Sequence, residues 1–367
     1  MSYTGPKVHI DLAQLAKNYQ LVRNEVGNIP VMATVKANGY GHGAVQVSKT
    51  LEKEGVSYFA VFTLEEGIEL RDAGITTDIL VYSKLDPNRL SEAEAHNLTL
   101  NVSSFDDLQA LKSHQGDSIK VHLKIDTGMT RLGVPLQQAE AFLQEANQID
   151  GIEIEGLYSH FATADEGDLS YANDQLNKFN DVLAIAEKLG INTTFIHCSN
   201  SGASLNLPES RFNMVRVGML LYGAFPSDEV PQDLPIKPVM TFTAPVVEIR
   251  DVKAGTPISY GGVYTTEKDT RIAVVQAGFA DGVPRPWYVD GFVKFKDQNF
   301  KITGRICMDQ LMIDVGSADI QHGDEVLIFG SDKINTITME TIADAIDSTP
   351  YVIATDIKGR TLRKYRN

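Results

Sequence analysis

The first two thirds of the chain repeat one unit, in which a short β-branched run, a polar or glycine-containing loop and a helix-like segment follow one another. Strands that alternate with helices form right-handed βαβ units and a parallel sheet. Eight such units within about 220 residues fit the size of a closed (β/α)8 barrel of the TIM type. The expected strands are residues 31–35, 58–62, 78–82, 98–102, 119–125, 152–158, 193–197 and 213–217, and the expected helices include 64–73, 104–112, 136–146 and 174–189.

An open, doubly wound parallel sheet is the alternative architecture. Such a sheet usually carries a glycine fingerprint, G-x-G-x-x-G, directly after its first strand. The segment that begins at Lys36 contains no such fingerprint. The barrel is therefore favoured.

After Pro231 the pattern changes to short strand-like runs separated by glycine turns, which is typical of an all-β domain of barrel or sandwich type. We therefore expect a barrel over residues 1–232 and a mostly β C-terminal domain over residues 233–367. A linker at 226–238 and one short helix near 342–346 are also expected. The expected C-terminal strands are 242–249, 256–260, 271–277, 292–295, 301–303, 312–315 and 325–328.

Charge and composition narrow the class of protein. The formal net charge of −15 argues against a nucleic-acid partner, because a polyanion needs a basic surface. No stretch is apolar for long enough to cross a bilayer, and residues 1–6 lack the basic and apolar regions of a signal peptide. Only two cysteines occur, Cys198 and Cys307, which makes a disulfide framework improbable. We expect a cytoplasmic enzyme or small-molecule binder with no membrane partner.

Barrels of this type place their chemistry at the carboxyl ends of the strands, and Lys36 directly follows the first strand. A lone lysine at such a position is more often a surface residue. The Asn-Gly-Tyr-Gly-His-Gly loop that follows Lys36 changes this balance, because its glycines permit close backbone approach to a ligand. A desolvated lysine is also a suitable nucleophile for a Schiff base.

The fifth strand departs from the continuous apolar run that a buried parallel strand normally shows. It alternates instead, which places on one face the residues Lys120, His122, Lys124 and Asp126. Charges at such a site must be paired or functional. A structural Lys124–Asp126 pair near the rim is one interpretation. A functional site is the other, because Arg131 lies on the loop above Lys124.

The last three strands end in further polar groups, namely His160, Ser201, Arg216 and Gly218. A single buried histidine is most often a satisfied core residue, and a single arginine on a strand is most often ion-paired. Ser201 and Gly218, however, lie where barrels of this type recurrently bind phosphate. The agreement of several strand ends is what favours an active site.

Taken together, these segments resemble the alanine racemase family, the barrel-type class of pyridoxal-phosphate (PLP) enzymes. The resemblance spans essentially the whole chain. Its motifs are the Lys36 loop, Asp126-Thr127-Gly128-Met129 with Arg131, Ser159-His160-Phe161, Asn200-Ser201, Asn213 to Gly218, Ser259-Tyr260-Gly261 and Gly304 to Gln310.

The resemblance implies that L-alanine and D-alanine are interconverted through a PLP external aldimine by two bases, without a metal ion. Lys36 forms the internal aldimine and then moves the α-proton of the D-isomer, while Tyr260 acts on the L-isomer from the opposite face. The product D-alanine supplies cell-wall peptidoglycan. Tyr260 and Met308 reach the active site of the partner, which implies a homodimer with composite sites.

Roles for other residues also follow from the resemblance. Arg216 faces the pyridine nitrogen with His160 hydrogen-bonded behind it, and because arginine cannot deliver a proton the ring stays a weaker electron sink. Lys124 matches a position that is carbamylated in many relatives. Contacts to the substrate carboxylate match Arg131 and Met308, and phosphate-holding positions match Tyr40, Ser201, Gly218, Met219 and Tyr351.

Two departures from the family pattern leave substrate selectivity open. Phe279 and Val283 stand where relatives usually have tyrosines, and Phe279 matches the inner gate of the substrate channel. Other functions on this architecture are a racemase for serine or a larger amino acid, an aldolase or a decarboxylase. Arg216 argues against a decarboxylase, because a decarboxylase would be expected to place an acidic residue at the pyridine nitrogen. A non-catalytic PLP carrier is a further alternative, but it needs no β domain.

Overall fold

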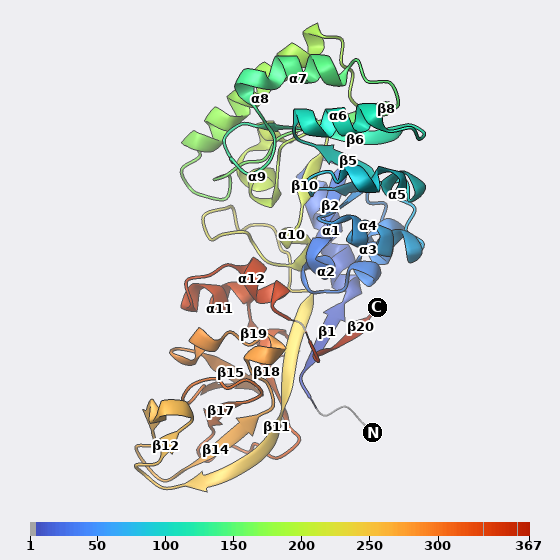
Figure 1. The fold of residues 1–367 in the computed structure, drawn as a ribbon. Helices are drawn as coiled ribbons and strands as arrows, with labels where there is room; N and C mark the ends of the chain where they lie inside the picture. Colours follow the sequence, from blue (N-terminus) through green and yellow to red (C-terminus); the bar gives the residue numbers. More distant parts are fainter. Residues whose placement is uncertain (1–4, 333, 358) are drawn as a thin grey trace.

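The alternating segments form the parallel barrel that the sequence predicts (Figure 1). This computed structural model describes residues 5–332, 334–357 and 359–367, and within them eight parallel strands follow one another from β10 through β2 to β9. The barrel is nearly closed, since the Arg216 amide donates to the Ser199 carbonyl at 3.0 Å between its two end strands. The strands are β2 (Val31–Thr34), β3 (Tyr58–Val61), β4 (Ile79–Val81), β5 (Thr99–Val102), β6 (Ile119–Asp126), β8 (Ile152–Tyr158), β9 (Phe195–His197) and β10 (Val215–Val217), with β7 (Val134–Pro135) beside β6.

Helices follow the barrel strands and cover their outer face (Figure 1). The first of them, α1, begins directly after Asp11, whose carboxylate accepts from the amide of Gln14 at 2.7 Å and so caps the helix. The helices of this part are α1 (Leu12–Glu25), α2 (Lys36–Tyr40), α3 (Ala44–Lys53), α4 (Leu64–Asp72), α5 (Leu90–Ala95), α6 (Phe105–Ser113), α7 (Ala139–Ala146), α8 (Ser170–Lys188), α9 (Ser201–Asn206) and α10 (Met219–Tyr222).

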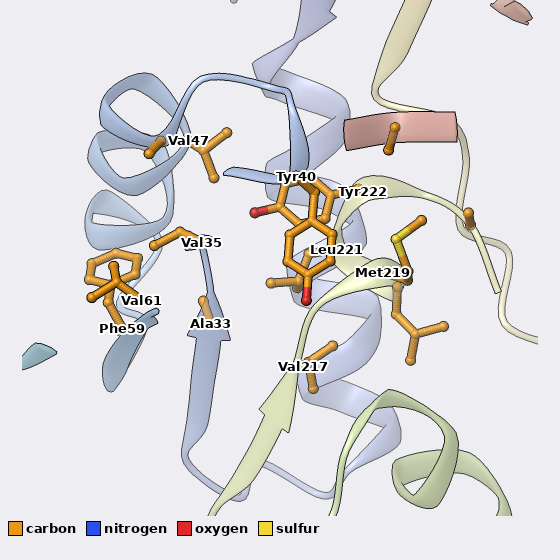
Figure 2. Packing of buried hydrophobic residues seen from close by; sticks show 14 of the residues in the cluster. Ala33, Val35, Tyr40, Val47, Phe59, Val61, Val217, Met219, Leu221 and Tyr222 are labelled. Carbon is orange, nitrogen blue, oxygen red and sulfur yellow. The ribbon is translucent and has the colours of Figure 1, made fainter. Parts of the chain in front are cut away.

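Side chains of the barrel strands divide into two buried sets, because successive residues of a strand point to opposite faces. Phe59 and Val61 of β3 belong to the main apolar core together with Val47 of α3 (Figure 2). Tyr58 and Ala60 of the same strand belong to a second, smaller cluster with one residue each from β2 and β4 and with Met214, which directly precedes β10. This second cluster lies inside the barrel, where the ring of Tyr58 contacts that of His122.

The C-terminal domain is mostly β, as predicted, and its long central strand is β11. The first and last strands of the described residues both belong to this sheet, because β1 pairs antiparallel with β11 and parallel with β20 (Figure 1). The sequence did not indicate β1, whose partners lie near the other end of the chain. The domain division at residues 232 and 233 stays a prediction. The strands are β1 (Lys7–Asp11), β11 (Met240–Val252), β12 (Pro257–Ile258), β13 (Tyr264–Thr265), β14 (Thr270–Val275), β15 (Phe292–Phe295), β16 (Gln298–Lys301), β17 (Leu311–Asp314), β18 (Glu325–Ser331), β19 (Thr336–Ile337) and β20 (Leu362–Arg366).

Two short helices, α11 (Met339–Ala345) and α12 (Pro350–Thr355), lie between the β sheet and the barrel (Figure 1). The sequence predicted one of them, and the second begins at a proline, which is favoured at the first helical position. Helix α12 packs against α2 at the carboxyl ends of the barrel strands. It therefore brings part of the C-terminal domain to the mouth of the barrel.

The structure can be compared with what composition suggested about membrane spans and cysteines. In the described part of the chain, no helix combines the length and the apolar character needed to cross a membrane. Cys198 and Cys307 are both free thiols.

Candidate active site

The carboxyl ends of the barrel strands and helix α12 enclose a cavity of 710 Å³. A cavity of this size suits a small organic cofactor together with a small substrate. Met219 is fully buried at the start of α10, and it is not among the described residues that line the cavity; nor are Tyr260 and Met308. The predicted site residues that line it are Lys36, Tyr40, Lys124, Arg131, His160, Ser201, Arg216, Gly218 and Tyr351.

Lys36 begins a turn whose backbone is in the left-handed helical region. The φ angle is 52° at Ala37, 54° at Asn38 and 49° at Tyr40. A non-glycine residue in this region costs roughly 1–2 kcal/mol, and such strain is concentrated at functional sites. The side-chain oxygen of Asn38 accepts from the amide of Ala44 at 3.0 Å and so helps to hold the turn.

Two glycines of this turn have a role that we did not expect. A Cβ atom added at Gly41 would overlap the carbonyl oxygen of Ala354 in α12. One added at Gly43 would overlap the hydroxyl of Tyr365 in β20. The close approach at these two glycines is thus that of the C-terminal segment and not that of a ligand.

Glu66 is a residue of the site that our sequence analysis missed. Its carboxylate accepts from the amide of Ala37 at 2.6 Å and from that of Phe62 at 2.7 Å. It also completes the capping box of α4 with Thr63. The Thr-x-x-Glu spacing before a helix could have identified Glu66. Its bond to Ala37 ties the turn of Lys36 to the start of α4.

The amines of Lys36 and Lys124 lie in a cationic and largely dehydrated environment. Burial first, and then the charge of Arg131, lowers the pKa of Lys36. Burial lowers the pKa of Lys124 to about 7, with further contributions from Arg216 and Arg131. Among the described residues, no carboxylate forms an ion pair with either amine. The carboxylate of Asp126 instead accepts from the backbone of its own loop, so the structural Lys124–Asp126 pair is not formed.

Arg216 is buried and donates to acceptors on several sides. Its Nη atoms donate to the carbonyls of Ser159 at 2.9 Å and Cys198 at 3.0 Å. They also donate to the ring nitrogens of His160 at 3.0 Å and His197 at 2.8 Å, so the predicted contact with His160 is present. The Nε–H has no acceptor in the described part of the protein. Because Arg216 lines the cavity, this donor is available to a bound group.

Hydroxyl and amide groups gather at one corner of the cavity. The amide of Gly218 lies 3.0 Å from the hydroxyl of Ser201, and a Cβ atom added at Gly218 would lie 2.9 Å from the hydroxyl of Tyr40. The ring of Tyr40 packs against that of Tyr222, at 5.1 Å between centroids (Figure 2). Its centroid also lies 5.8 Å from that of Tyr351. Burial raises the pKa of Tyr40, so its hydroxyl stays a hydrogen-bond donor.

Tyr260 and Met308 lie on the C-terminal domain, where their side chains are 67% and 56% exposed. Ser259, next to Tyr260, has a φ of 63°. Its hydroxyl donates to the carbonyl of Arg305 at 2.6 Å and so joins the loops that carry the two exposed residues. The loop of Met308 is in turn held by the amide of Ala280, which donates to the Met308 carbonyl at 3.0 Å.

Phe279 and Val283, which stand where relatives usually have tyrosines, differ in environment. Phe279 is 39% exposed and its amide donates to the carbonyl of Cys307, so it lies beside the loop of Met308. Val283 is buried in the core of the β domain. Of the two residues, only Phe279 is accessible to a molecule outside the chain.

Comparison with known proteins identifies the family. The model of the alanine racemase N-terminal domain matches residues 10–226, and that of the C-terminal domain matches residues 239–365. The chain belongs to the alanine racemase family. Members of this family are amino-acid racemases and therefore isomerases.

Individual alanine racemases are similar over their whole length. Alanine racemase 2 of Caldanaerobacter subterraneus is 39% identical over 98% of this chain and 94% of its own. The alanine racemase of Methanococcus maripaludis is 37% identical over 97% of each chain. Among solved structures, the alanine racemase of Clostridium difficile has a TM-score of 0.94 at 36% identity, and covers all of this chain and 97% of its own. The Streptomyces lavendulae enzyme has a TM-score of 0.94 at 35% identity, and covers 100% and 98%.

Proposed function

We propose that this protein interconverts L-alanine and D-alanine with PLP as its cofactor and with Lys36 and Tyr260 as its two bases. The observation that carries the proposal is the cavity at the barrel mouth, where the dehydrated amine of Lys36 and a free donor of Arg216 meet in one space. Membership of the alanine racemase family supports alanine as the substrate.

The residues present fit PLP. The amine of Lys36 has a lowered pKa, which favours the neutral form that attacks an aldehyde. The corner around Gly218, Ser201 and Tyr40 offers hydroxyl and amide groups to a phosphate. Tyr351, which lines the same cavity, and Met219 at the start of α10 are assigned to this phosphate site on the family pattern. When bound, PLP supplies an aldehyde for the amino group and an electron-accepting ring that acidifies the substrate α-proton.

Arg216 determines how strongly the pyridine ring of PLP can withdraw electrons. Its guanidinium keeps a donor for the pyridine nitrogen but cannot transfer a proton to it, because arginine stays protonated. His160, hydrogen-bonded to Arg216, supports the position of this donor. We infer that this arrangement favours the return of the α-proton and limits side reactions such as transamination.

Inversion at the α-carbon needs one base on each side of it. Lys36 moves the proton of D-alanine, and Tyr260 of a second copy moves that of L-alanine. The exposed positions of Tyr260 and Met308, outside their own barrel cavity, support this composite arrangement in a homodimer. Arg131 from the barrel and Met308 from the partner copy hold the substrate carboxylate.

Lys124 is proposed to react with carbon dioxide. A pKa of about 7 leaves much of its amine neutral near neutrality. The neutral nitrogen attacks carbon dioxide, so that an N–C bond forms while one C=O π bond breaks, and one N–H proton then passes to water. The product is an anionic carbamate, which attracts Arg131. A carbamate signal in ¹³C NMR after incubation with ¹³C-bicarbonate is expected from the wild type but not from Lys124→Met, and a plain ammonium would contradict the proposal.

We place the reaction in the cytoplasm, where D-alanine supplies peptidoglycan synthesis. The two free cysteines are compatible with this reducing compartment.

Exchange of the α-proton with D₂O tests the function directly. The wild type is expected to exchange both alanine enantiomers faster than serine or larger amino acids. Lys36→Ala and Tyr260→Phe are expected to lose exchange preferentially on D-alanine and L-alanine, respectively. A PLP carrier would show the visible absorbance of bound cofactor without exchange, and that result would contradict the proposal.

A further inference from the structure

A chain of hydrogen bonds leads from Arg216 away from the cavity, through the inside of the barrel. Nη1 of Arg216 lies 2.8 Å from Nδ1 of His197, and Nε2 of His197 lies 2.9 Å from Nδ1 of His122. Nε2 of His122 lies 3.4 Å from a carboxylate oxygen of Glu155. Both histidine side chains are fully buried. The chain thus joins strands β10, β9, β6 and β8 across the barrel.

The donors and acceptors of these hydrogen bonds can be arranged in only one direction. A guanidinium has only donors, so Nδ1 of His197 must accept from Arg216 and its proton must be on Nε2. That proton is donated to Nδ1 of His122, whose own proton must then be on Nε2 and point to Glu155. Burial and the charge of Arg216 lower the pKa of His197, and burial lowers that of His122, so both rings are neutral.

Glu155 is the anionic end of this chain. The hydroxyl of Tyr58 donates to its carboxylate at 2.6 Å, and the amine of Lys120 lies at 3.3 Å. Burial alone would raise the pKa of Glu155, but the hydrogen bonds from His122 and Tyr58 outweigh it and lower the pKa to about 2. The carboxylate therefore stays charged although it is buried.

The backbone of β8 is irregular where it supplies this group. Val121 pairs with Ile154, whereas the next residue, His122, pairs with Gly156, so Glu155 is an extra residue in the ladder. Such a bulge redirects side chains and is frequent next to active sites. A Cβ atom added at Gly156 would lie 2.6 Å from the ring of His122. The bulge thus brings together the carboxylate of Glu155 and Gly156, whose missing side chain leaves room for the imidazole of His122.

We propose that Glu155 is a positioning residue, which acts through His122 and His197 to hold Arg216 in one orientation and to balance its charge. The negative charge of Glu155 favours the tautomers of His122 and His197 that are protonated on Nε2. With these tautomers the Nη atoms of Arg216 are occupied by protein acceptors, and its Nε–H is left as the donor for the cofactor. The effect on the reaction rests on the proposed function, whereas the hydrogen-bond chain itself does not.

The test is solid-state ¹⁵N NMR of histidine-labelled holoenzyme, combined with steady-state kinetics. The wild type is expected to show His122 and His197 as neutral rings protonated on Nε2. Glu155→Gln keeps the size of the side chain but removes its charge, so the ring resonances of both histidines are expected to move. The kcat for racemisation is expected to fall about tenfold with little change in KM, which corresponds to about 1.4 kcal/mol.

Asp78→Asn is the matched control. It removes an equal charge from the other carboxylate near Lys120, at 3.3 Å, but Asp78 makes no hydrogen bond to either histidine in the described structure. This variant is expected to leave the histidine resonances and kcat unchanged.

Two results would overturn the proposal. One is equal effects of Asp78→Asn and Glu155→Gln, and the other is a wild-type spectrum in which either ring is charged or protonated on Nδ1. The wild-type spectrum decides even if Glu155→Gln does not fold. If the tautomers are as expected but the wild type does not racemise alanine, the proposed function fails and the positioning chain stands.

Discussion

The barrel and the β domain carry their proposed site residues in opposite environments. Arg216 in the barrel is 4% exposed and has protein partners on several sides. Tyr260 and Met308 on the β domain are more than half exposed, and Val263 and Phe279 nearby add further exposed apolar surface at 48% and 39%. Exposed apolar groups of this kind typically mark an interaction surface.

This difference indicates that the two halves of the site become functional in different ways. The barrel half is assembled when one chain folds, because its donors and its strained turn are held by contacts within that chain. In the proposed homodimer, a second copy of the chain covers the β-domain half. Binding of the cofactor should therefore depend on the barrel and helix α12 of a single chain, while racemisation should depend on both halves of the proposed site.

The largest effect is expected from removal of the barrel base. Lys36→Ala should lower racemisation by roughly 10³–10⁴-fold, since it removes a proton-transferring group. The visible absorbance of the lysine-bound cofactor should be lost as well, whereas the oligomeric state should stay as in the wild type. Absorbance, gel filtration and coupled assays of both alanine enantiomers measure these properties. If Lys36→Ala still racemised alanine, the distinction between the two halves of the site would be wrong.

A smaller loss is expected from the β-domain base. Tyr260→Phe should lower racemisation by about 10²–10³-fold and leave the absorbance of the bound cofactor unchanged, because the barrel half is intact. Tyr264→Phe is the control, since its hydroxyl binds Asp314 within the same β domain at 3.1 Å. Equal losses in both variants would mean that Tyr260 has no special role.

The contacts of Arg216 allow a test inside the barrel half. Arg216→Glu places an acid where the guanidinium now faces the cavity, so the pyridine nitrogen can be protonated and the ring becomes a stronger electron sink. Pyridoxamine formation per racemisation event should rise by about tenfold, which corresponds to about 1.4 kcal/mol. Product analysis by chromatography measures this ratio, and an unchanged ratio counts against the assigned role.

The last prediction concerns the pH dependence of stability and not the reaction. The pKa of Lys124 is about 7 in the folded protein, against about 10.4 for an ordinary lysine. Between these values the unfolded chain binds more protons, so the free energy of unfolding should rise with pH. From pH 7 to pH 9 the part due to Lys124 is roughly 2 kcal/mol.

Urea unfolding of the apoprotein in carbon-dioxide-free buffer, at the two pH values, measures this part as the difference between the wild type and Lys124→Met. Lys120→Met is the control, because nearby carboxylates raise the pKa of Lys120 although burial opposes them. A wild type whose pH dependence equals that of Lys124→Met would refute the lowered pKa.

The sequence was sufficient for features with a local signal. The alternation of strands and helices predicted the barrel, and polar residues after successive strands predicted the cavity around Lys36 and Arg216. Features that depend on distant pairing were not predicted. Strand β1 is recognisable only from its partners at the far end of the chain. The role of Gly41 depends on a helix more than three hundred residues later.

The buried chain behind Arg216 shows the same limit within a single strand. The alternation of β6 placed His122 on the same face as Lys124, but its partner Glu155 faces it only because of the bulge in β8. A one-residue irregularity of this kind leaves no simple trace in the hydrophobic pattern.

The most direct measurement mixes two inactive variants, Lys36→Ala and Tyr260→Phe, under conditions that let subunits exchange. If each site takes its lysine from one copy and its tyrosine from the other, a mixed dimer has one intact site. Random exchange then restores about one quarter of the wild-type activity, because half of the dimers are mixed and each has one of two sites. Activity that stays at the level of the separate variants, although gel filtration and mass spectrometry show mixed dimers, would contradict the account.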